Sequence, residues 1–339
     1  MKNETPKDAL FALIKSLVET PGPSGQEHLI REVIKAEIKD YCDEIVTDAL
    51  GNLIARKGKK AADGKRVMIS AHVDEIGVMI THVDENGFAR FITIGGVNPL
   101  TCIGGRVLFM NGVSGVIGVE RLEPNTMPKH ENLFIDTGAT SVADSPVKVG
   151  DVAGFYRPAV QMGSRLVAKS MDDRIAAVVA IEAMKAIKTT PNELYFVFSV
   201  QEEVGLRGAT TAAYGVDPDL GLAVDVTPTG DTPKSTRRSV ALGKGPAIKV
   251  RDSSFIADTR IINWMVKEAE AQKLPYQMEV LEAGGTDGRA IQMTRAGVPA
   301  GCLSIACRYV HSPSEMVDRA DVENSIKLLA GLLSKKIVL

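Results

Sequence analysis

The chain has 339 residues, of which 45% are hydrophobic and 24% are charged, and this ordinary globular composition predicts a sizeable core and about two domains. The formal net charge of −2 argues against nucleic acid or an anionic membrane as a partner. No apolar run reaches the ~20 residues that cross a bilayer, and the amino-terminal stretch lacks the apolar core of a signal peptide.

The first half of the chain predicts two helices, one strand and then a β-rich segment. Residues 8–40 indicate two helices separated by a Pro/Gly turn at 19–27, and residues 66–72 indicate a strand. Between about 75 and 165 the apolar runs are short and glycines recur, as at Gly95 and Gly96, with no helical period. Short strands with glycine turns predict a small β-barrel.

After residue 166 helices and strands alternate. The expected helices cover 174–188, 256–273, 288–296 and a carboxy-terminal segment capped by Asp318. The expected strands cover 193–200, 220–226, 276–284 and 300–310. This alternation predicts an α/β layer sandwich around a mostly parallel sheet, into which the β-rich segment is inserted.

The four cysteines have no C-x-x-C spacing. We therefore expect reduced thiols in a cytoplasmic protein, and neither a disulfide framework nor a zinc site made of cysteine.

Histidines and carboxylates follow the predicted strands, where ligands bind in open α/β sheets. The strand-end residues, in chain order, are His72 and Asp74, Asp172 and Asp173, Glu202 and Glu203, Asp225, Thr286 and Asp287, and His311. Six strand ends of this kind predict a single acidic site.

Two imidazoles with several carboxylates suit Zn, Co or Mn. Three ligand carboxylates carry −3, two divalent cations carry +4, and a bridging hydroxide restores neutrality, whereas without cations the carboxylates would raise each other's pKa. Two ions ~3.5–4 Å apart can clamp a water, lower its pKa and polarise a carbonyl. One carboxylate must stay off the metals to accept the proton, which gives Glu202 and Glu203 different tasks.

Each of these residues also has a purely structural interpretation. His72 and His311 could be core histidines, Glu202 could cap the helix after Gly208, and Asp225 could be a turn residue. Asp287 could cap a helix that begins near Gly288, a strong local preference of aspartate. The roles of Asp173 and Asp287 stay open at this level.

The motifs resemble those of the tetrahedral (TET) aminopeptidases, also described as the glutamyl aminopeptidase and cellulase-M-like family of two-metal peptidases. In chain order the matching segments are PGPSGQE (21–27), DALGNLIA (48–55), AHVDE (71–75), MDDR (171–174), QEEVGLRGA (201–209), DV (225–226), GGTDG (284–288) and RYVHS (308–312). Each motif is weak or moderate alone, but the ordered set is specific and covers essentially the whole chain.

The resemblance implies a three-layer α/β/α, phosphorylase/hydrolase-like catalytic domain made of residues 1–74 and 163–339. The inserted segment 75–162 would be a PDZ-like barrel used for dimerisation. The metal site would hold two divalent ions, Zn or Co. His72, Asp172 and Asp225 would hold one ion, and Asp172, Glu203 and His311 the other. Glu202 would be the general base and acid, and Asp74 would orient His72.

The implied activity is the release of N-terminal amino acids from peptides, by attack of a hydroxide that bridges the two ions. Family dimers assemble into hollow dodecamers, so we expect a homo-oligomer, with peptides and neither nucleic acid nor membrane as partners. The preferred N-terminal residue, the native metal and the choice between dimer and dodecamer stay open.

Three other functions fit the sequence less well. A two-metal deacylase or amidase could use the same scaffold, and would not require a free α-amine. An endoglucanase using Glu202 and Glu203 is disfavoured, because glycosidases place two carboxyls about 5–10 Å apart across the scissile bond. A non-catalytic scaffold would have lost Glu202 or a ligand, and every one of these residues is present.

Overall fold

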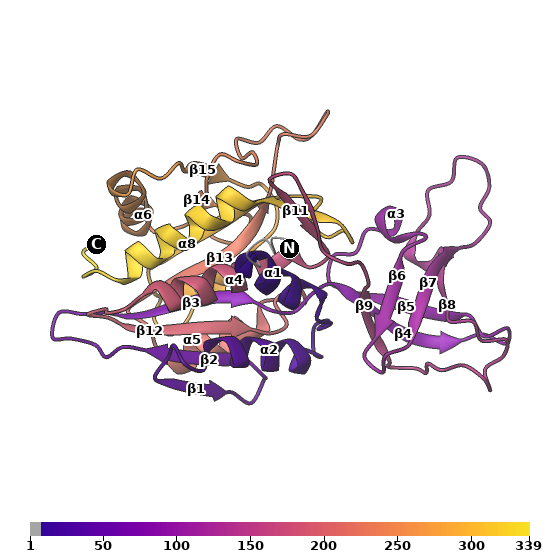
Figure 1. Ribbon diagram of the computed structural model, residues 1–339. Coiled ribbons are helices and arrows are strands. Elements are labelled where there is room, and N and C mark those ends of the chain that lie inside the picture. Colours follow the sequence, from indigo (N-terminus) through magenta and orange to yellow (C-terminus); the bar gives the residue numbers. More distant parts are fainter. Residues whose placement is uncertain (1–7) are drawn as a thin grey trace, which may run out of the picture.

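The computed structural model describes residues 8–339, which form an α/β unit and a β-barrel that lie beside one another (Figure 1). Within these residues the α/β unit has an 11-stranded sheet with the main order β1-β2-β12-β3-β13-β16-β17-β11-β10, and β14 and β15 lie off this path. The strands are β1 (Glu44–Thr47), β2 (Leu53–Lys57), β3 (Arg66–His72), β10 (Val160–Met162), β11 (Arg165–Ala168), β12 (Glu193–Ser199), β13 (Leu220–Pro228), β14 (Ala247–Arg251), β15 (Gln277–Val280), β16 (Ala300–Arg308) and β17 (Glu315–Asp318).

The four central strands run in the same direction. β3 pairs in parallel with β12 and β13, and β13 pairs in parallel with β16. β17 is antiparallel to both β16 and β11, so β11 also points the same way as the central strands. The carboxyl ends of β12, β3, β13, β16 and β11 therefore meet at one edge of the sheet.

Helices cover both faces of this sheet. The helices of the unit are α1 (Ala9–Glu19), α2 (His28–Ile38), α4 (Met171–Ala186), α5 (Arg207–Val216), α6 (Thr259–Ala271), α7 (Asp287–Gln292) and α8 (Arg319–Leu333). Along β3, Val67 and Ile69 belong to the core shared with α1, α2, α4, α6 and α8, whereas Met68 belongs to the core shared with α5 and α7. Successive side chains of a strand point to opposite faces, so a strand buried on both faces is apolar at every position.

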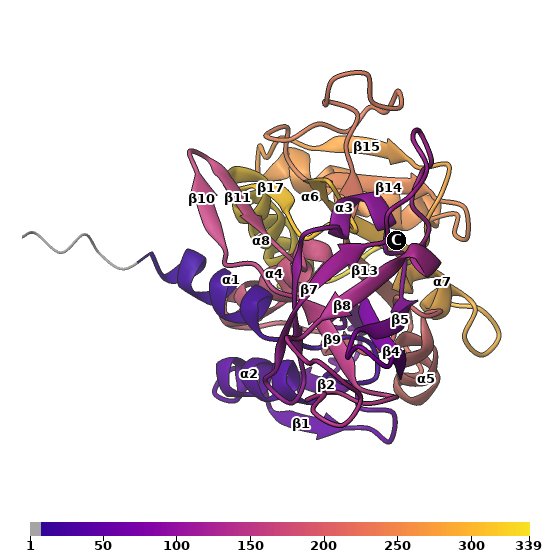
Figure 2. The same cartoon turned by 90° about the vertical axis from the view of Figure 1, so that its right-hand side faces the viewer.

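The β-rich segment closes into a barrel in the order β4-β5-β8-β7-β6-β9, which Figure 2 shows in front of the α/β unit. Its strands are β4 (Gly77–Val83), β5 (Ala89–Ile94), β6 (Arg106–Phe109), β7 (Ser114–Val119), β8 (Leu133–Asp136) and β9 (Val152–Phe155), and α3 (Pro99–Cys102) and η1 (His130–Asn132) lie in its loops. Val78, Phe91, Phe109 and Ile117 are among the residues of its separate buried core. The predicted fold class, an α/β layer structure with an inserted small barrel, is confirmed.

Several element boundaries differ from the expectation. The predicted helix 174–188 ends at Ala186, and its regular turns begin where expected, because Asp172 and Asp173 at the start of α4 have non-helical backbone angles. The helix expected from 256 begins at Thr259, because the Asp258 side chain caps it by accepting from Arg260 N. The Asp318 cap of α8 is confirmed, since its side chain accepts from Ala320 N at 2.8 Å. β10 lies at the end of the range expected for the barrel, but it pairs with β11 in the large sheet. None of the helices within residues 8–339 is both long and apolar enough to cross a membrane.

Candidate metal centre

The shared edge of the sheet brings the predicted ligands into one pocket of about 350 Å³. His72 is the last residue of β3, Asp225 lies near the end of β13, and Glu202 and Glu203 follow β12 directly. Asp172 stands in the first turn of α4, just after β11, and His311 follows β16. All six side chains line this pocket.

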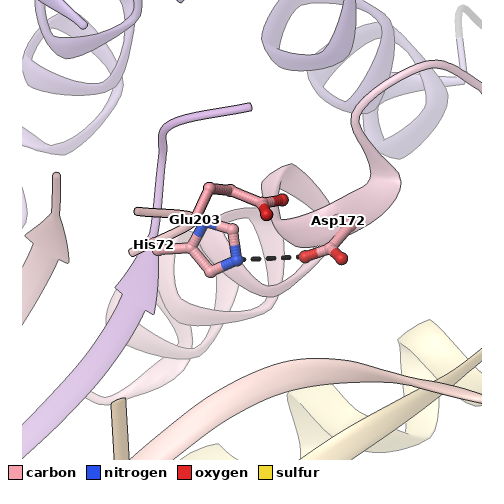
Figure 3. A group of neighbouring side chains, drawn as sticks. All are labelled: His72, Asp172 and Glu203. Atoms are coloured by element: carbon pink, nitrogen blue, oxygen red, sulfur yellow. Dashed lines mark hydrogen bonds and ion pairs between the residues drawn. The ribbon is translucent and has the colours of Figure 1, made fainter. Parts of the chain in front are cut away.

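Asp172 lies between the two histidines and contacts each with a different oxygen. Its Oδ1 lies 3.0 Å from His72 Nε2, as Figure 3 shows, and its Oδ2 lies 3.3 Å from His311 Nε2. His311 Nε2 is also 3.3 Å from Glu203 Oε2. Asp172 therefore connects two histidines that lie at or just after the ends of different strands of the sheet.

Two overlapping groups of side chains have ligand atoms that lie within 4.8 Å of one another: His72, Asp172 and Glu203, and His72, Asp173 and Asp225. Both Asp173 oxygens and Glu203 Oε1 are buried without a hydrogen-bond partner in the described part of the chain. Buried oxygens of this kind are costly unless they bind a donor or a cation. Imidazole and carboxylate are the donors that borderline divalent metals prefer, so these residues fit such ions.

The electrostatics of the cluster indicate an excess of negative charge. Burial and the charges of neighbouring acids raise the pKa of Asp173 and of Asp225 well above their ordinary value. Burial alone would lower the pKa of His311, but its hydrogen bonds with Asp172 and Glu203 raise it to about 11. The protein alone therefore favours protons on these groups, and divalent cations would replace that positive charge.

Glu202 differs from Glu203 in its contacts. Among the described residues, its only cationic partner within ion-pair distance is His72, whose Nε2 lies 3.9 Å from Glu202 Oε2. Burial, opposed in part by the charge of His72, raises the pKa of Glu202 well above its ordinary value. This glutamate lines the pocket and lies outside both ligand groups, so it is placed to exchange a proton there.

Asp74 holds the backbone that carries both glutamates. It accepts from Glu202 N at 2.9 Å, from Glu203 N at 3.2 Å and from Ser24 Oγ at 2.6 Å. Its carboxylate lies 3.5 Å from His72 Nδ1, while its own carbonyl lies closer to that nitrogen, at 3.2 Å. Asp74 therefore contacts His72 as expected, and it also fixes the position of the Glu202–Glu203 backbone.

Three structural alternatives for these residues are wrong. Glu202 does not cap α5, which follows Leu206 and has no side-chain cap, and Asp225 lies within β13 and not in a turn. The cap of α7 is Thr286, while Asp287 accepts from Ser70 Oγ at 2.6 Å and from Ser199 Oγ at 2.5 Å.

One of the six predicted strand ends, the one expected before Asp287, is also wrong. β15 is parallel to β14, and β14 is antiparallel to β16, so β15 points away from the shared edge. Asp287 reaches the centre through the loop that follows β15, at the start of α7.

Two contacts at His311 were missed by sequence reasoning. The buried Glu315 accepts from His311 N at 2.8 Å and from Asp172 N at 2.9 Å, so it joins the two segments that carry these residues. The barrel contributes the second contact, because His311 Nδ1 lies 3.1 Å from the Gly96 carbonyl oxygen. With the proton of a neutral imidazole on Nδ1, the lone pair of Nε2 on the side of Asp172 and Glu203 is free to bind a cation. The adjacent glycines Gly95 and Gly96 were the only sequence feature that could have indicated this close contact, although a turn explained them equally well.

The remaining histidines lie outside the centre. His130 Nε2 is 2.9 Å from the Val97 carbonyl and so supports the loop after Gly96. His28 begins α2 and His82 lies in β4.

Comparisons with known proteins point to one family. A family model described as M42 glutamyl aminopeptidase matches residues 51–328. A putative aminopeptidase of Acetivibrio thermocellus is 47% identical over 95% of this chain and 98% of its own length. The lysyl aminopeptidase of Pyrococcus furiosus is 34% identical over 96% of this chain and 97% of its own length.

Solved structures agree with these relatives. An aminopeptidase from the archaeon Desulfurococcus kamchatkensis superposes with a TM-score of 0.92 at 37% identity, over 96% of this chain and 94% of its own. The Pyrococcus horikoshii TET1 peptidase, described as assembling into a tetrahedron or a large octahedral shell, superposes with a TM-score of 0.86 at 32% identity. That match covers 96% of this chain and 99% of the TET1 chain.

Proposed function

This chain belongs to the M42 glutamyl aminopeptidase family, and we propose that it releases N-terminal amino acids from peptides with the help of two divalent cations. The observation that carries the two-cation proposal is the position of Asp172, with one oxygen toward each histidine. One carboxylate that contacts two imidazoles supports the proposal, because it is placed to be shared by two cations held a few ångströms apart.

We assign the ligands as follows. His72, Asp172 and Asp225 would hold one cation, and Asp172, Glu203 and His311 would hold the other. Asp172 is preferred over Asp173 as the shared ligand because Asp172 contacts both histidines. When bound, zinc or cobalt ions supply a Lewis acid for the substrate carbonyl and lower the pKa of water.

The protein groups perform the proton transfers. Glu202 accepts a proton from the attacking water and delivers it to the nitrogen of the departing peptide, so that one carboxylate serves both steps. Asp74 keeps Glu202 beside His72 through the Glu202 amide, and Glu315 keeps His311 and Asp172 together.

The Glu202→Gln variant tests this assignment. We expect turnover of an aminoacyl p-nitroanilide to fall by roughly 10²–10⁴-fold while the metal content, measured by elemental analysis, is unchanged. Glu85→Gln, at an exposed turn of the barrel, is the matched control. Full activity of the Glu202 variant would remove this residue from the mechanism.

The glycosidase alternative is not supported by this geometry. Glu202 and Glu203 are successive residues whose amides bind the same Asp74 carboxylate, and Glu203 Oε2 points toward His311. They do not flank a gap in which a sugar could lie. A substrate with an acetylated α-amine distinguishes an aminopeptidase from a deacylase on the same scaffold. An aminopeptidase loses activity on that substrate, whereas a deacylase does not require the free α-amine.

We also propose assembly into a dimer-based dodecamer in the cytoplasm, with the barrel at the dimer contact. The described assembly of the TET1 peptidase supports this proposal, and so do the exposed Ile92, Leu100 and Val116 on the barrel. Four free thiols are compatible with a reducing compartment. Light scattering on a sizing column tests the assembly, and a monomeric mass at micromolar concentration would contradict it.

A further inference from the structure

A second cavity adjoins the metal centre and shares two residues with it. This crevice has a volume of about 580 Å³, and Val310 and His311 line both it and the metal pocket. Its walls come from the barrel loop at Asn98 and Thr101, from the β10–β11 hairpin and from the loop between β16 and β17. The two cavities therefore adjoin one another at His311.

The proposed reaction requires space on both sides of the bond that breaks. On one side lies the single N-terminal residue, and on the other lies the rest of the peptide, which leaves as the amine product. The pocket of about 350 Å³ contains Glu202 and the ligand cluster, so it receives the scissile carbonyl and the first residue. We propose, building on the aminopeptidase function above, that the adjoining crevice binds the departing peptide and that Arg157 recognises its C-terminal carboxylate when that peptide is short.

The lining of the crevice fits a peptide that has an apolar first residue. Met162, Val167 and Met316 supply apolar wall, and Met162 is 58% exposed, so its side chain is free to cover a ligand. The hydroxyls of Ser312 and Ser314 add polar groups for a backbone. A surface that combines apolar side chains with hydroxyl groups suits a peptide chain better than a free ion.

Arg157 is the cation of this crevice. Its Nη1 donates to Ser314 Oγ, which holds the guanidinium against the β16–β17 loop. Within residues 8–339 no carboxylate lies within ion-pair distance of Arg157, so its charge is available to a ligand. A guanidinium binds a carboxylate through two parallel N–H groups, which a neutral amide terminus cannot reproduce.

Three substrates with the same N-terminal residue test the proposal: an aminoacyl p-nitroanilide, a tripeptide with a free carboxylate, and the same tripeptide as its C-terminal amide. For the unchanged enzyme we expect a lower KM for the free tripeptide than for its amide. In Arg157→Met we expect the KM of the free tripeptide to rise about 3- to 10-fold, with kcat nearly unchanged, so that the acid and the amide become equivalent. Arg157→Glu should make the amide the better substrate.

Arg121→Met, which removes another exposed arginine of the barrel segment, is the matched control and should keep the preference for the free acid. Equal losses with the anilide and the free tripeptide would overturn the proposal, because the anilide has no departing peptide. An unchanged KM of Arg157→Met for the free tripeptide would overturn it as well. Failure of the aminopeptidase function itself would look different, since the unchanged enzyme would then hydrolyse none of the three substrates.

Discussion

The contact between the barrel and His311 gives a sharp prediction, because glycine is the only residue that fits there. A Cβ built on Gly96 would lie 2.5 Å from His311 Nδ1 and 2.9 Å from Cε1. Restoring an ordinary van der Waals contact requires the imidazole to move by about 1 Å. A displacement of this size at a reacting centre costs about 10²-fold in rate, which corresponds to ~2.7 kcal/mol in the barrier. We therefore expect Gly96→Ala to lower kcat/KM by about two orders of magnitude.

The assay is hydrolysis of an aminoacyl p-nitroanilide, with metal content and thermal unfolding measured on the same preparations. The matched control is Gly215→Ala in α5, where an added Cβ meets no atom within 4 Å. That control should keep its activity, because it changes only helix propensity, by ~0.5–1 kcal/mol. Wild-type kcat/KM in a folded Gly96→Ala protein would refute the inference that the barrel positions His311.

Dialysis against a chelator should abolish activity and lower the Tm by a few degrees, because the buried carboxylates then lose their counter-charge. Zinc or cobalt added alone should restore both the activity and the Tm. A chelated enzyme with full activity would exclude the metal mechanism. Glu75→Gln should destabilise the fold by ~3–5 kcal/mol in denaturant unfolding, because it leaves Lys169 buried without its partner at 2.6 Å. The double variant with Lys169→Met should regain much of this loss, and a single variant as stable as wild type would contradict the argument. Burial alone would raise the pKa of Glu75, but the charges of Lys169 and Arg174 lower it. The stability that the ionised Glu75 contributes is therefore fully present above its unfolded-state pKa of ~4.3, and it is lost as the pH falls through the lower folded-state pKa.

The sequence could predict those strands whose side chains are buried, because burial requires apolar residues at known positions along the strand. β3, β12 and β16 are buried along nearly their whole length, so each appears as a continuous apolar run, and all three were expected close to their observed bounds. β1 has mostly exposed residues and β10 has only exposed ones, and neither produces a run or an alternation. Edge strands of this kind are held by backbone pairing to a neighbour, which leaves little trace in side-chain composition.

The convergence of the candidate ligands on one pocket could be predicted because parallel strands place their carboxyl ends together, whatever the details of the loops. Asp287 shows the limit of that rule, since its preceding strand runs the other way and only the three-dimensional path of the loop brings it to Ser70 and Ser199. The role of Glu315 could not be predicted from the sequence either. Its carboxylate binds the backbone amides of His311 and Asp172, and every residue except proline has such an amide, so no residue type marks its partners.

The barrel contacts the candidate metal centre directly, in addition to the role in assembly that we propose for it. Its Gly96 carbonyl faces His311 Nδ1, and an atom added at Gly95 would meet the Glu203 carboxylate at 2.9 Å. The following residues of the same loop, Asn98 and Thr101, line the crevice beside His311. A small rotation of the barrel would therefore alter one ligand and the path of the departing peptide together. Any contact that fixes the barrel, including one to a second copy of the chain, would also fix the geometry at His311.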